Sequence, residues 1–380
     1  METFNWKPWP TFNEKHQLAV KEVIESNQLF AADKVKDFEK AYSKFVSSKY
    51  AIGVGNATQG LQLSLHALGI GYGDEVIVTP YSWISSATCV LMQGAVPIFV
   101  DIESDSFGLS PKAIKKAITN RTKAVILVHM FGYPAKIEDI LNICSDNSIH
   151  LIEDASHCHG AKFNKKSIGT FGDLGIFSLH QRKALPVGDG GIICTNNASI
   201  YQDIWKLRSF GHDKLSFNYR MTEFAAALGL VGLELLDHDN EKRIENHKLL
   251  ASKLDKKFFK VLEPSEGSFA VFYSNLIEIC LSYERQEELL KAASDINLPL
   301  KRTWQPLHQH PNFKRENMNN NYAPWDNHYI DFIEPADLKL PISEKYQKEK
   351  IFELDCHPLI EEEEVSKAAL FLNDFVTKLS

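Results

Sequence analysis

The stretch GDEVIVTPYSWISSATCVLMQGAVPIFVDI, residues 73–102, decides the fold class of this chain. It begins with a β-rich apolar run at Glu75–Thr79, continues with a helical pattern at Ser82–Gln93, and ends with a second apolar run at Pro97–Asp101. A strand, a helix and another strand in this order form the crossover unit of a parallel sheet. Because both strand-like runs are continuously apolar, we expect helices to cover both faces of that sheet.

The same alternation extends from residue 50 to about residue 195. Further strands are predicted at Ala124–His129, His150–Glu153, Leu174–Ser178 and Gly191–Thr195. Helices are predicted at Ala57–Leu68, Pro111–Ile118 and Ala135–Ser145, the first of which carries leucines at helical spacing. The sequence therefore predicts a large α/β domain over residues 1–240, with a mostly parallel central sheet flanked by helices and an N-terminal arm over about residues 1–30.

The pattern changes after the helical run AAALGLVGLELLDH, residues 225–238, which is apolar on nearly all sides and is expected to cross the middle of the molecule or an interface. Charged helices are then predicted at Asn240–Leu254 and Glu284–Ala293, a strand at Ser268–Ile279 and a final helix near Glu362–Leu379. Asn312–Asn327 is rich in turn-forming side chains and is predicted to be a loop. Because helices and strands do not alternate strictly here, residues 241–380 are predicted to form a smaller α+β domain.

The composition excludes several classes of protein. The 380 residues include 42 Lys and Arg against 49 Asp and Glu, a net charge of −7, and 44% of them are hydrophobic, as in a globular chain. The longest run of like charge, Glu361–Glu364, is short and acidic, so we expect no nucleic acid partner. The chain has no signal-like start and no apolar stretch of about 18 residues, so we expect no membrane partner and a cytoplasmic location. The six cysteines include no CxxC pair, which favours reduced thiols over disulfides or a metal site.

Three segments carry groups that suit a small phosphorylated aromatic cofactor. The first, GVGNATQG at residues 53–60, is a glycine-rich turn between a strand-like run and a helix. Its free backbone N–H groups could hold a phosphate together with the Thr58 hydroxyl. The segment does not match the GxGxxG dinucleotide fingerprint, so a nicotinamide oxidoreductase is poorly supported. The alternative is an ordinary helix start that Asn56 or Thr58 caps.

The second and third segments supply a carboxylate and an amine. In LIEDASHCHG, residues 151–160, Asp154 stands at the carboxyl end of a buried strand, where ligands bind to open α/β sheets. In FSLHQRKALPVGDGG, residues 177–191, Lys183 follows a strand end and precedes a glycine-rich turn. A partly desolvated amine in such a place can form a Schiff base with an aldehyde. The alternatives are a turn or helix cap for Asp154 and a solvated surface position for Lys183.

The order of these segments resembles that of the pyridoxal-phosphate-dependent sugar aminotransferases of the DegT/StrS family, which have the aspartate aminotransferase fold, fold type I. The resemblance runs from about Lys36 to His310 and includes GVGNATQGLQLSL, LIEDASHCHGA, FGDLGIFSLHQRKALPVGDGGIICTN, the NYRMTEFAAALGL run and PLHQHPNF. It implies pyridoxal 5'-phosphate as the cofactor, with pyridoxamine 5'-phosphate as its intermediate form. It also implies a homodimer whose active sites are shared across the interface.

The resemblance implies roles for individual residues. Lys183 matches the lysine that holds the cofactor as a Schiff base and later moves the proton, and Asp154 matches the carboxylate that pairs with the pyridinium nitrogen. The other implied cofactor residues are His157 at the phenolic oxygen, Trp83 stacked on the ring, Ala57, Thr58 and Ser178 at the phosphate, and Asn218 of the second subunit at the same phosphate. A plain core position for Trp83, a structural histidine and a turn asparagine are the alternatives for three of them.

By the same resemblance, the enzyme transfers an amino group from L-glutamate to a keto sugar. A nucleotide-linked sugar is expected first, for the biosynthesis of a surface polysaccharide or an antibiotic. The segment RSFGHDKLSFN, residues 208–218, is shorter than the corresponding loop of many relatives, which leaves open a smaller acceptor such as a keto-sugar acid, a ketocyclitol or a keto phosphate. The candidate residues for substrate contact are basic or aromatic: Arg208, Lys214, Arg220, Arg302, Trp304 and His308.

Two interpretations without amino transfer stay open. Some relatives are sugar dehydratases in which a histidine replaces the cofactor lysine, and the presence of Lys183 argues against that activity. A non-catalytic regulator that binds the cofactor is the other interpretation, and the presence of both Lys183 and Asp154 argues against it.

Overall fold

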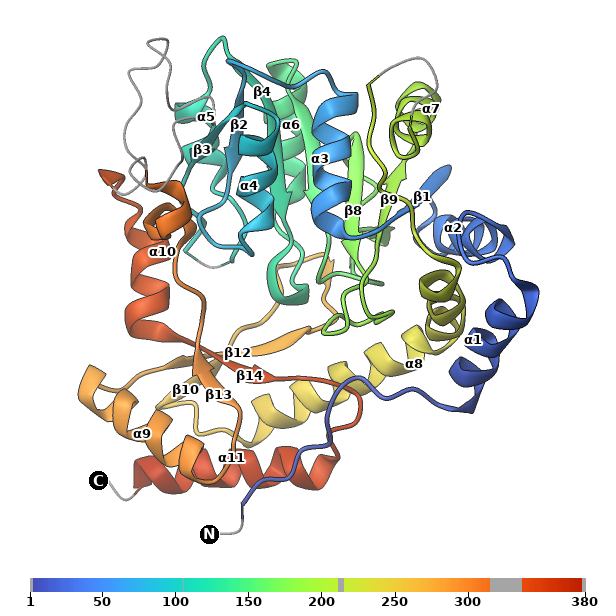
Figure 1. Cartoon of the computed structure of the whole chain (residues 1–380). Coiled ribbons are helices and arrows are strands. Elements are labelled where there is room, and N and C mark those ends of the chain that lie inside the picture. Colours follow the sequence, from blue (N-terminus) through green and yellow to red (C-terminus); the bar gives the residue numbers. More distant parts are fainter. Residues whose placement is uncertain (1–2, 105, 211–214, 315–336, 378–380) are drawn as a thin grey trace.

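A computed structural model describes residues 3–104, 106–210, 215–314 and 337–377 of the chain. Within these residues the chain forms a large sheet between two layers of helices and a smaller antiparallel sheet beside it (Figure 1). The long helix α8, Glu223–Lys253, extends from the helices of the large sheet to the small sheet. The predicted α/β class with a mostly parallel central sheet is confirmed.

The large sheet contains every strand that the sequence predicts between residues 75 and 195. In sheet order its strands are β1 (Tyr50–Val54), β9 (Gly191–Thr195), β8 (Leu174–Ser178), β5 (His150–Asp154), β4 (Thr122–Val128), β2 (Glu75–Val78) and β3 (Val96–Phe99). Neighbours from β8 to β3 are parallel, whereas β9 is antiparallel to both β8 and β1. The carboxyl ends of β4, β5 and β8 therefore meet at one edge of the sheet, which is where α/β proteins bind ligands.

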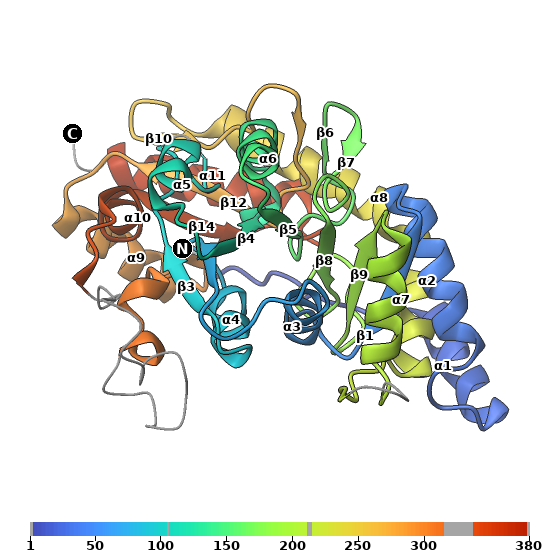
Figure 2. The same ribbon diagram turned by 90° about the horizontal axis from the view of Figure 1, so that it is seen from above.

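Alternate side chains of these strands pack against opposite layers of helices. Val76 and Val78 of β2 pack into one layer and Ile77 into the other. The first layer contains α3 (Ala57–Ala67), α4 (Ser85–Met92) and α7 (Ala198–Leu207). The second contains α2 (Asp33–Val46), α5 (Pro111–Ala117), α6 (Ile137–Asp146) and the first half of α8. Figure 2 shows α3 and α4 on the side of the sheet opposite to α5 and α6.

The small sheet is built from the last third of the chain. In sheet order its strands are β10 (Phe259–Val261), β12 (Ser274–Ile279), β14 (Ile351–Asp355) and β13 (Leu300–Arg302), and all neighbours are antiparallel. Its core also takes side chains from α9 (Tyr283–Asp295), α11 (Glu362–Thr377) and the end of α8, while α10 (Pro341–Lys345) precedes β14. A third sheet joins β11 (Ser268–Phe269), β6 (Lys162–Phe163) and β7 (Lys166–Ser167). None of the described helices combines the length and the apolarity that crossing a bilayer requires.

Several predicted boundaries differ from the structure. The helical runs predicted separately on either side of residue 240 form the single helix α8, so that residue lies inside a helix. The strand predicted at Ser268–Ile279 is two strands in two sheets, because the chain turns at Phe272, where φ is +48°. Helix α4 begins at Ser85 instead of Ser82, so that the residues before it form a loop. Of the loop predicted at Asn312–Asn327, residues 315–327 lie outside the described part of the chain.

The N-terminal arm lies over the junction between the large and small sheets. The backbone N–H of Phe4 donates to the Ile296 carbonyl beside the small sheet at 2.7 Å. Residues 4–9 then line a cavity together with Arg182 from the turn after β8 and with residues of the small sheet, and α1 (Glu14–Ser26) packs against α8. The arm is the dark blue segment that crosses the lower part of Figure 1.

Candidate active site

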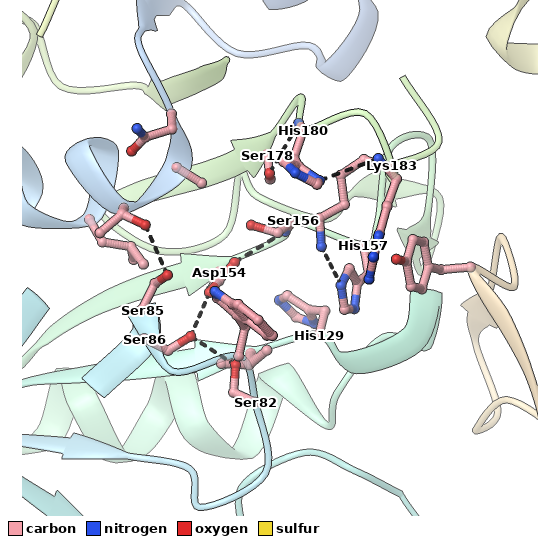
Figure 3. A pocket seen from close by; sticks show the side chains of 18 of the residues that line it. Ser82, Ser85, Ser86, His129, Asp154, Ser156, His157, Ser178, His180 and Lys183 are labelled. Carbon is pink, nitrogen blue, oxygen red and sulfur yellow. Dashed lines mark hydrogen bonds between the residues drawn. The ribbon is translucent and has the colours of Figure 1, made fainter. Parts of the chain in front are cut away.

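A cavity of about 310 Å³ opens at the carboxyl edge of the large sheet, facing the small sheet. Eight of the residues that the sequence predicts for the site line it: Ala57, Thr58, Trp83, Asp154, His157, Ser178, Lys183 and Trp304. Figure 3 shows Asp154, His157, Ser178 and Lys183 around the same space. The strand-end positions inferred from sequence thus meet in one pocket.

Lys183 lies in the turn that follows β8. Its backbone carbonyl accepts a hydrogen bond from the Trp9 indole Nε1–H of the N-terminal arm at 3.0 Å. Its side chain is half-buried, with Nζ 2.6 Å from His157 Nε2 and 5.1 Å from the centre of the Tyr273 ring. The amine is therefore held from two sides at the inner end of the cavity.

The partners of His157 fix the direction of its hydrogen bond to the lysine. His157 Nδ1 accepts from the backbone N–H of Phe131 at 3.1 Å, so this nitrogen carries no proton. In a neutral imidazole the proton then lies on Nε2, which must donate to Lys183 Nζ. Only a neutral amine has the lone pair to accept that bond, so the contact favours the uncharged, nucleophilic form of Lys183.

The electrostatics of the cavity agree with this assignment. Burial lowers the pKa of Lys183 to about 8, although the negative charge of Asp154 acts in the opposite direction. Burial, together with the charge of Lys183, lowers the pKa of His157 well below its ordinary value. Both groups thus lose their charge more readily than in water.

Asp154 is a buried carboxylate with a partner at each oxygen. Its Oδ2 accepts from the Ser86 hydroxyl at 2.8 Å, and its Oδ1 accepts from the Ser156 backbone N–H at 3.2 Å. Ser86 is in turn 2.8 Å from the Ser82 hydroxyl, and the side chain of Asp154 is only 6% exposed (Figure 3). Hydrogen-bond donors at both oxygens fix the orientation of this carboxylate, so Asp154 can meet a cationic N–H group in the cavity.

The start of helix α3 offers an anion site on the opposite wall. The Asn56 side chain caps the helix by accepting from Gln59 N–H at 2.9 Å, so the helix cap that the sequence left as the alternative for this turn is present at Asn56. Among the described residues, the backbone N–H groups of Ala57 and Thr58 have no acceptor, as is usual in a first helical turn. A side chain at Gly191 would come within 2.6 Å of the Asn56 backbone, so only glycine lets this turn approach β9.

These groups fit pyridoxal phosphate. The unpartnered amides of Ala57 and Thr58, with the nearby Ser178 side chain, suit a phosphate at a helix start. Lys183 suits an aldehyde, and Asp154 suits a protonated ring nitrogen. Trp83 is 62% exposed and packs edge-on to Trp304 at 5.7 Å, so it stands at the mouth of the cavity and has a face free for a ring.

The remaining predicted substrate residues do not line this cavity. Arg302 pairs with Glu287 at 2.7 Å in the small domain, and His308 is fully buried beside Glu344 at 3.2 Å. Arg208 pairs with Glu39 at 2.5 Å. Carboxylates of this chain already pair with these three side chains, and their contact with substrate stays a prediction.

Asn218 and Arg220 lie together outside the cavity. Arg220 Nε donates to Asn218 Oδ1 at 3.0 Å, and its guanidinium lies over the rings of Phe30 and Phe210 at 4.7 and 5.2 Å. Lys214 lies outside the described residues. The predicted phosphate contact of Asn218 is therefore not made within this chain.

Sequence reasoning missed several residues that line the cavity: Asn56, Ser82, Ser85, Ser86, His129, Ser156, His180, Arg182, Asp189 and Tyr273. The serines of YSWISS, residues 81–86, could have been predicted to line the cavity, because small polar residues follow a strand end and begin a helix there. The position of Tyr273 could not have been predicted, because this residue comes from the turn before β12, far along the chain. Its ring stacks on His157 at 4.1 Å.

The fold and this site suit the class of α/β transferases that use a phosphorylated carbonyl cofactor. Comparison with known proteins then identifies the group, because residues 10–369 match the DegT/DnrJ/EryC1/StrS aminotransferase family. The chain belongs to this family and is an aminotransferase, as the resemblance implied.

Individual relatives agree with this assignment. GDP-perosamine synthase of Escherichia coli O157:H7 is 31% identical over 318 residues, 81% of this chain and 86% of that protein. L-glutamine:scyllo-inosose aminotransferase of Streptomyces griseus is 28% identical over 370 residues, 90% of this chain and 87% of that protein. The crystal structure of an aminotransferase from Psychrobacter cryohalolentis superimposes with a TM-score of 0.90 at 25% identity, covering 98% of this chain and 99% of that one.

Proposed function

We propose that this protein transfers an amino group from an amino acid to a keto sugar, with pyridoxal 5'-phosphate as the cofactor. The observation that carries the proposal is the hydrogen bond from His157 Nε2–H to Lys183 Nζ at 2.6 Å, which favours an uncharged amine opposite Asp154. Pyridoxal phosphate, when bound, supplies an aldehyde and a ring that accepts the electron pair of a substrate carbanion.

Some residues of this chain would hold the cofactor, and Lys183 would transfer protons. Asp154 keeps a ring nitrogen protonated, Ala57, Thr58 and Ser178 hold the phosphate, and Trp83 covers the ring face. Lys183 Nζ would remove a proton from the α-carbon of the donor in the first half-reaction and would deliver a proton to the reacting carbon of the acceptor in the second. The low pKa of this lysine suits both directions of that transfer.

For the acceptor, we propose a nucleotide-linked keto sugar. The support is the 31% identity to an enzyme named as a GDP-perosamine synthase. A smaller acceptor, such as a ketocyclitol, is the second candidate, because a scyllo-inosose aminotransferase matches over 90% of this chain and the segment 208–218 is short. By family resemblance the donor is L-glutamate.

We further propose a homodimer in which each copy completes the site of the other. The support is that Asn218 and Arg220 bear groups suited to a phosphate or carboxylate but lie outside the cavity of their own chain. Exposed apolar side chains surround them, including Phe30 and Phe210 at 59% and 61% exposure.

Six free cysteines, five of them buried, agree with a reducing compartment such as the cytoplasm.

A single-turnover experiment tests the proposed function. The protein is loaded with pyridoxamine phosphate and mixed with nucleotide-linked keto sugars, ketocyclitols, keto-sugar acids and small keto phosphates. The absorbance of pyridoxamine phosphate should fall, and that of pyridoxal phosphate should rise, with the nucleotide-linked sugars. A response only to compounds without a nucleotide would select the second candidate, and no response to any ketone would refute amino transfer.

The pH dependence of cofactor uptake follows from the pKa of Lys183. Protonated amines do not attack aldehydes, so uptake of pyridoxal phosphate by the cofactor-free protein should accelerate as pH rises through about 8 and then level off. An ordinary lysine would still accelerate near pH 10. Stopped-flow absorbance gives the profile.

His157→Gln provides the comparison for that profile. The glutamine amide oxygen can accept a hydrogen bond from an ammonium, so the midpoint should move to higher pH. A wild-type rate that keeps rising to pH 10, or a variant with an unchanged midpoint, would contradict the assigned hydrogen bond.

A further inference from the structure

A second cavity of about 590 Å³ adjoins the catalytic cavity under the N-terminal arm. We call it the arm chamber, and the residues that matter for its chemistry are Trp6, Trp9, Arg243, Lys301, Glu353 and His357. The two cavities share Arg182, Tyr273 and Trp304 as lining residues, so they are neighbours across these three side chains.

Arg243 is the unusual residue of the arm chamber. It belongs to α8, is 2% exposed, and its guanidinium lies 5.0 Å from the centre of the Trp9 ring. Its Nη1 donates to Asn240 Oδ1 at 3.3 Å. Among the described residues, no carboxylate lies within ion-pair distance of it.

The other buried arginine in the described part of the chain, Arg208, has the carboxylate partner that Arg243 lacks. Arg208, 8% exposed, pairs with Glu39 at 2.5 Å and also donates to the Gly53 carbonyl. A guanidinium cannot lose its charge in a protein, and an unpaired buried charge costs several kcal/mol. An anion that enters the arm chamber would remove this cost at Arg243.

The acidic groups of the arm chamber already have partners. Lys301 Nζ lies 3.6 Å from Glu353 and 3.5 Å from Asp355, and the Ser274 hydroxyl donates to Glu353 at 2.6 Å. Lys7 pairs with Glu361 at 3.0 Å. Among the described residues, the cations of this chamber without an ion pair are therefore Arg243 and, at the shared wall, Arg182.

Tyr273 and Trp9 of the arm chamber both contact Lys183 of the catalytic cavity. The ring of Tyr273 lies 5.1 Å from Lys183 Nζ and also lines the arm chamber. The Trp9 indole donates to the Lys183 carbonyl while its ring faces Arg243. A substrate whose reacting carbon lies at Lys183 can thus extend past Tyr273 toward the guanidinium.

We propose that Arg243 binds a carboxylate at the end of the substrate distant from the reacting carbon. The inference rests on the proposed amino transfer and adds the chemical class that the site selects: an acidic substrate that reaches into the arm chamber. The carboxylate can belong to the amino donor or to the acceptor, and the experiments distinguish these sources. Arg243 suits the group because a guanidinium binds a carboxylate through two parallel hydrogen bonds.

Binding of glutarate to the cofactor-loaded protein is the first test. Glutarate has two carboxylates and no amine, so it binds without reacting, and calorimetry gives its Kd. Arg243→Met should weaken binding by about 10- to 100-fold, the range for a charged hydrogen-bonded contact, and Arg243→Lys should weaken it less.

The matched control for this test is Lys301→Met. It removes the same charge from the same chamber, but from a side chain that is already ion-paired, and binding should change less than about twofold. Thermal unfolding and the cofactor absorbance verify that each variant is folded. If Arg243→Met does not fold, the Kd of Arg243→Lys for glutarate decides the test. Wild-type protein that fails to bind glutarate, or Arg243 variants that bind it normally, would overturn the proposal.

Separate half-reactions identify the source of the carboxylate. If it belongs to the donor, Arg243→Met should slow the reaction with L-glutamate and spare that with L-glutamine, which has an amide at the same position. If it belongs to the acceptor, the variant should slow the second half-reaction with acidic ketones and spare neutral ones. An equal effect on all substrates, or none, would refute the assignment. Glutarate binding that depends on Arg243 in a protein without any amino transfer would refute the proposed function alone.

Discussion

Replacing Lys183 by alanine is expected to abolish amino transfer. The variant would lose the amine that we propose binds the cofactor and moves the proton, and positioned acid–base groups contribute about 10²–10⁴-fold to rates. The purified variant should also lose the yellow colour of lysine-bound pyridoxal phosphate. Steady-state rates and visible absorption spectra measure both effects.

Lys162→Ala is the matched control for this prediction. Lys162 is an exposed lysine on β6, away from the cavity, so its replacement should leave rate and colour unchanged. A Lys183→Ala protein that keeps either turnover or the yellow colour would exclude Lys183 as the cofactor lysine.

Asp154→Asn is expected to lower turnover by about 10²–10⁴-fold. Asparagine keeps the size of the side chain and can still accept from the Ser86 hydroxyl, but it removes the negative charge that a ring N–H⁺ requires. Loss of one partner of a buried ion pair costs about 3–5 kcal/mol, which corresponds to this range. The rate of proton removal from the donor α-carbon, measured with deuterated L-glutamate, should fall in parallel.

Ser86→Ala gives a graded comparison for Asp154. It removes one hydrogen bond to the carboxylate and keeps its charge, so turnover should fall by about tenfold or less. If Asp154→Asn is no slower than Ser86→Ala, the charge of Asp154 does not act on the cofactor ring.

The chemical centre of the site could be predicted from sequence because it depends on short, continuous segments. Asp154 is the last residue of β5 and Lys183 follows the end of β8, and because these two strands are parallel their carboxyl ends lie at the same edge of the sheet. The register of β5 and β8, with Asp154 opposite Ile176, then fixes the distance between the two segments.

The substrate residues could not be predicted in the same way. Arg302 and His308 have the right chemistry for an anion, but Glu287 and Glu344 reach them from helices that single-sequence patterns cannot place in space. Arg243 was missed for the opposite reason. It lies in a charged helical run, where a solvated face is the ordinary expectation, and only the arrangement of α8 and the arm buries it without a counter-charge.

The continuity of α8 limits how this polypeptide can be divided. Its 31 residues extend for about 46 Å at the ordinary helical rise, and Leu236 and Leu250 of this one helix belong to two different apolar cores. A cut beside residue 240 would sever the helix in mid-span and separate each half from part of its hydrophobic contacts. A recombinant fragment that starts there would not fold as an autonomous unit, so the two lobes have to be expressed and studied together.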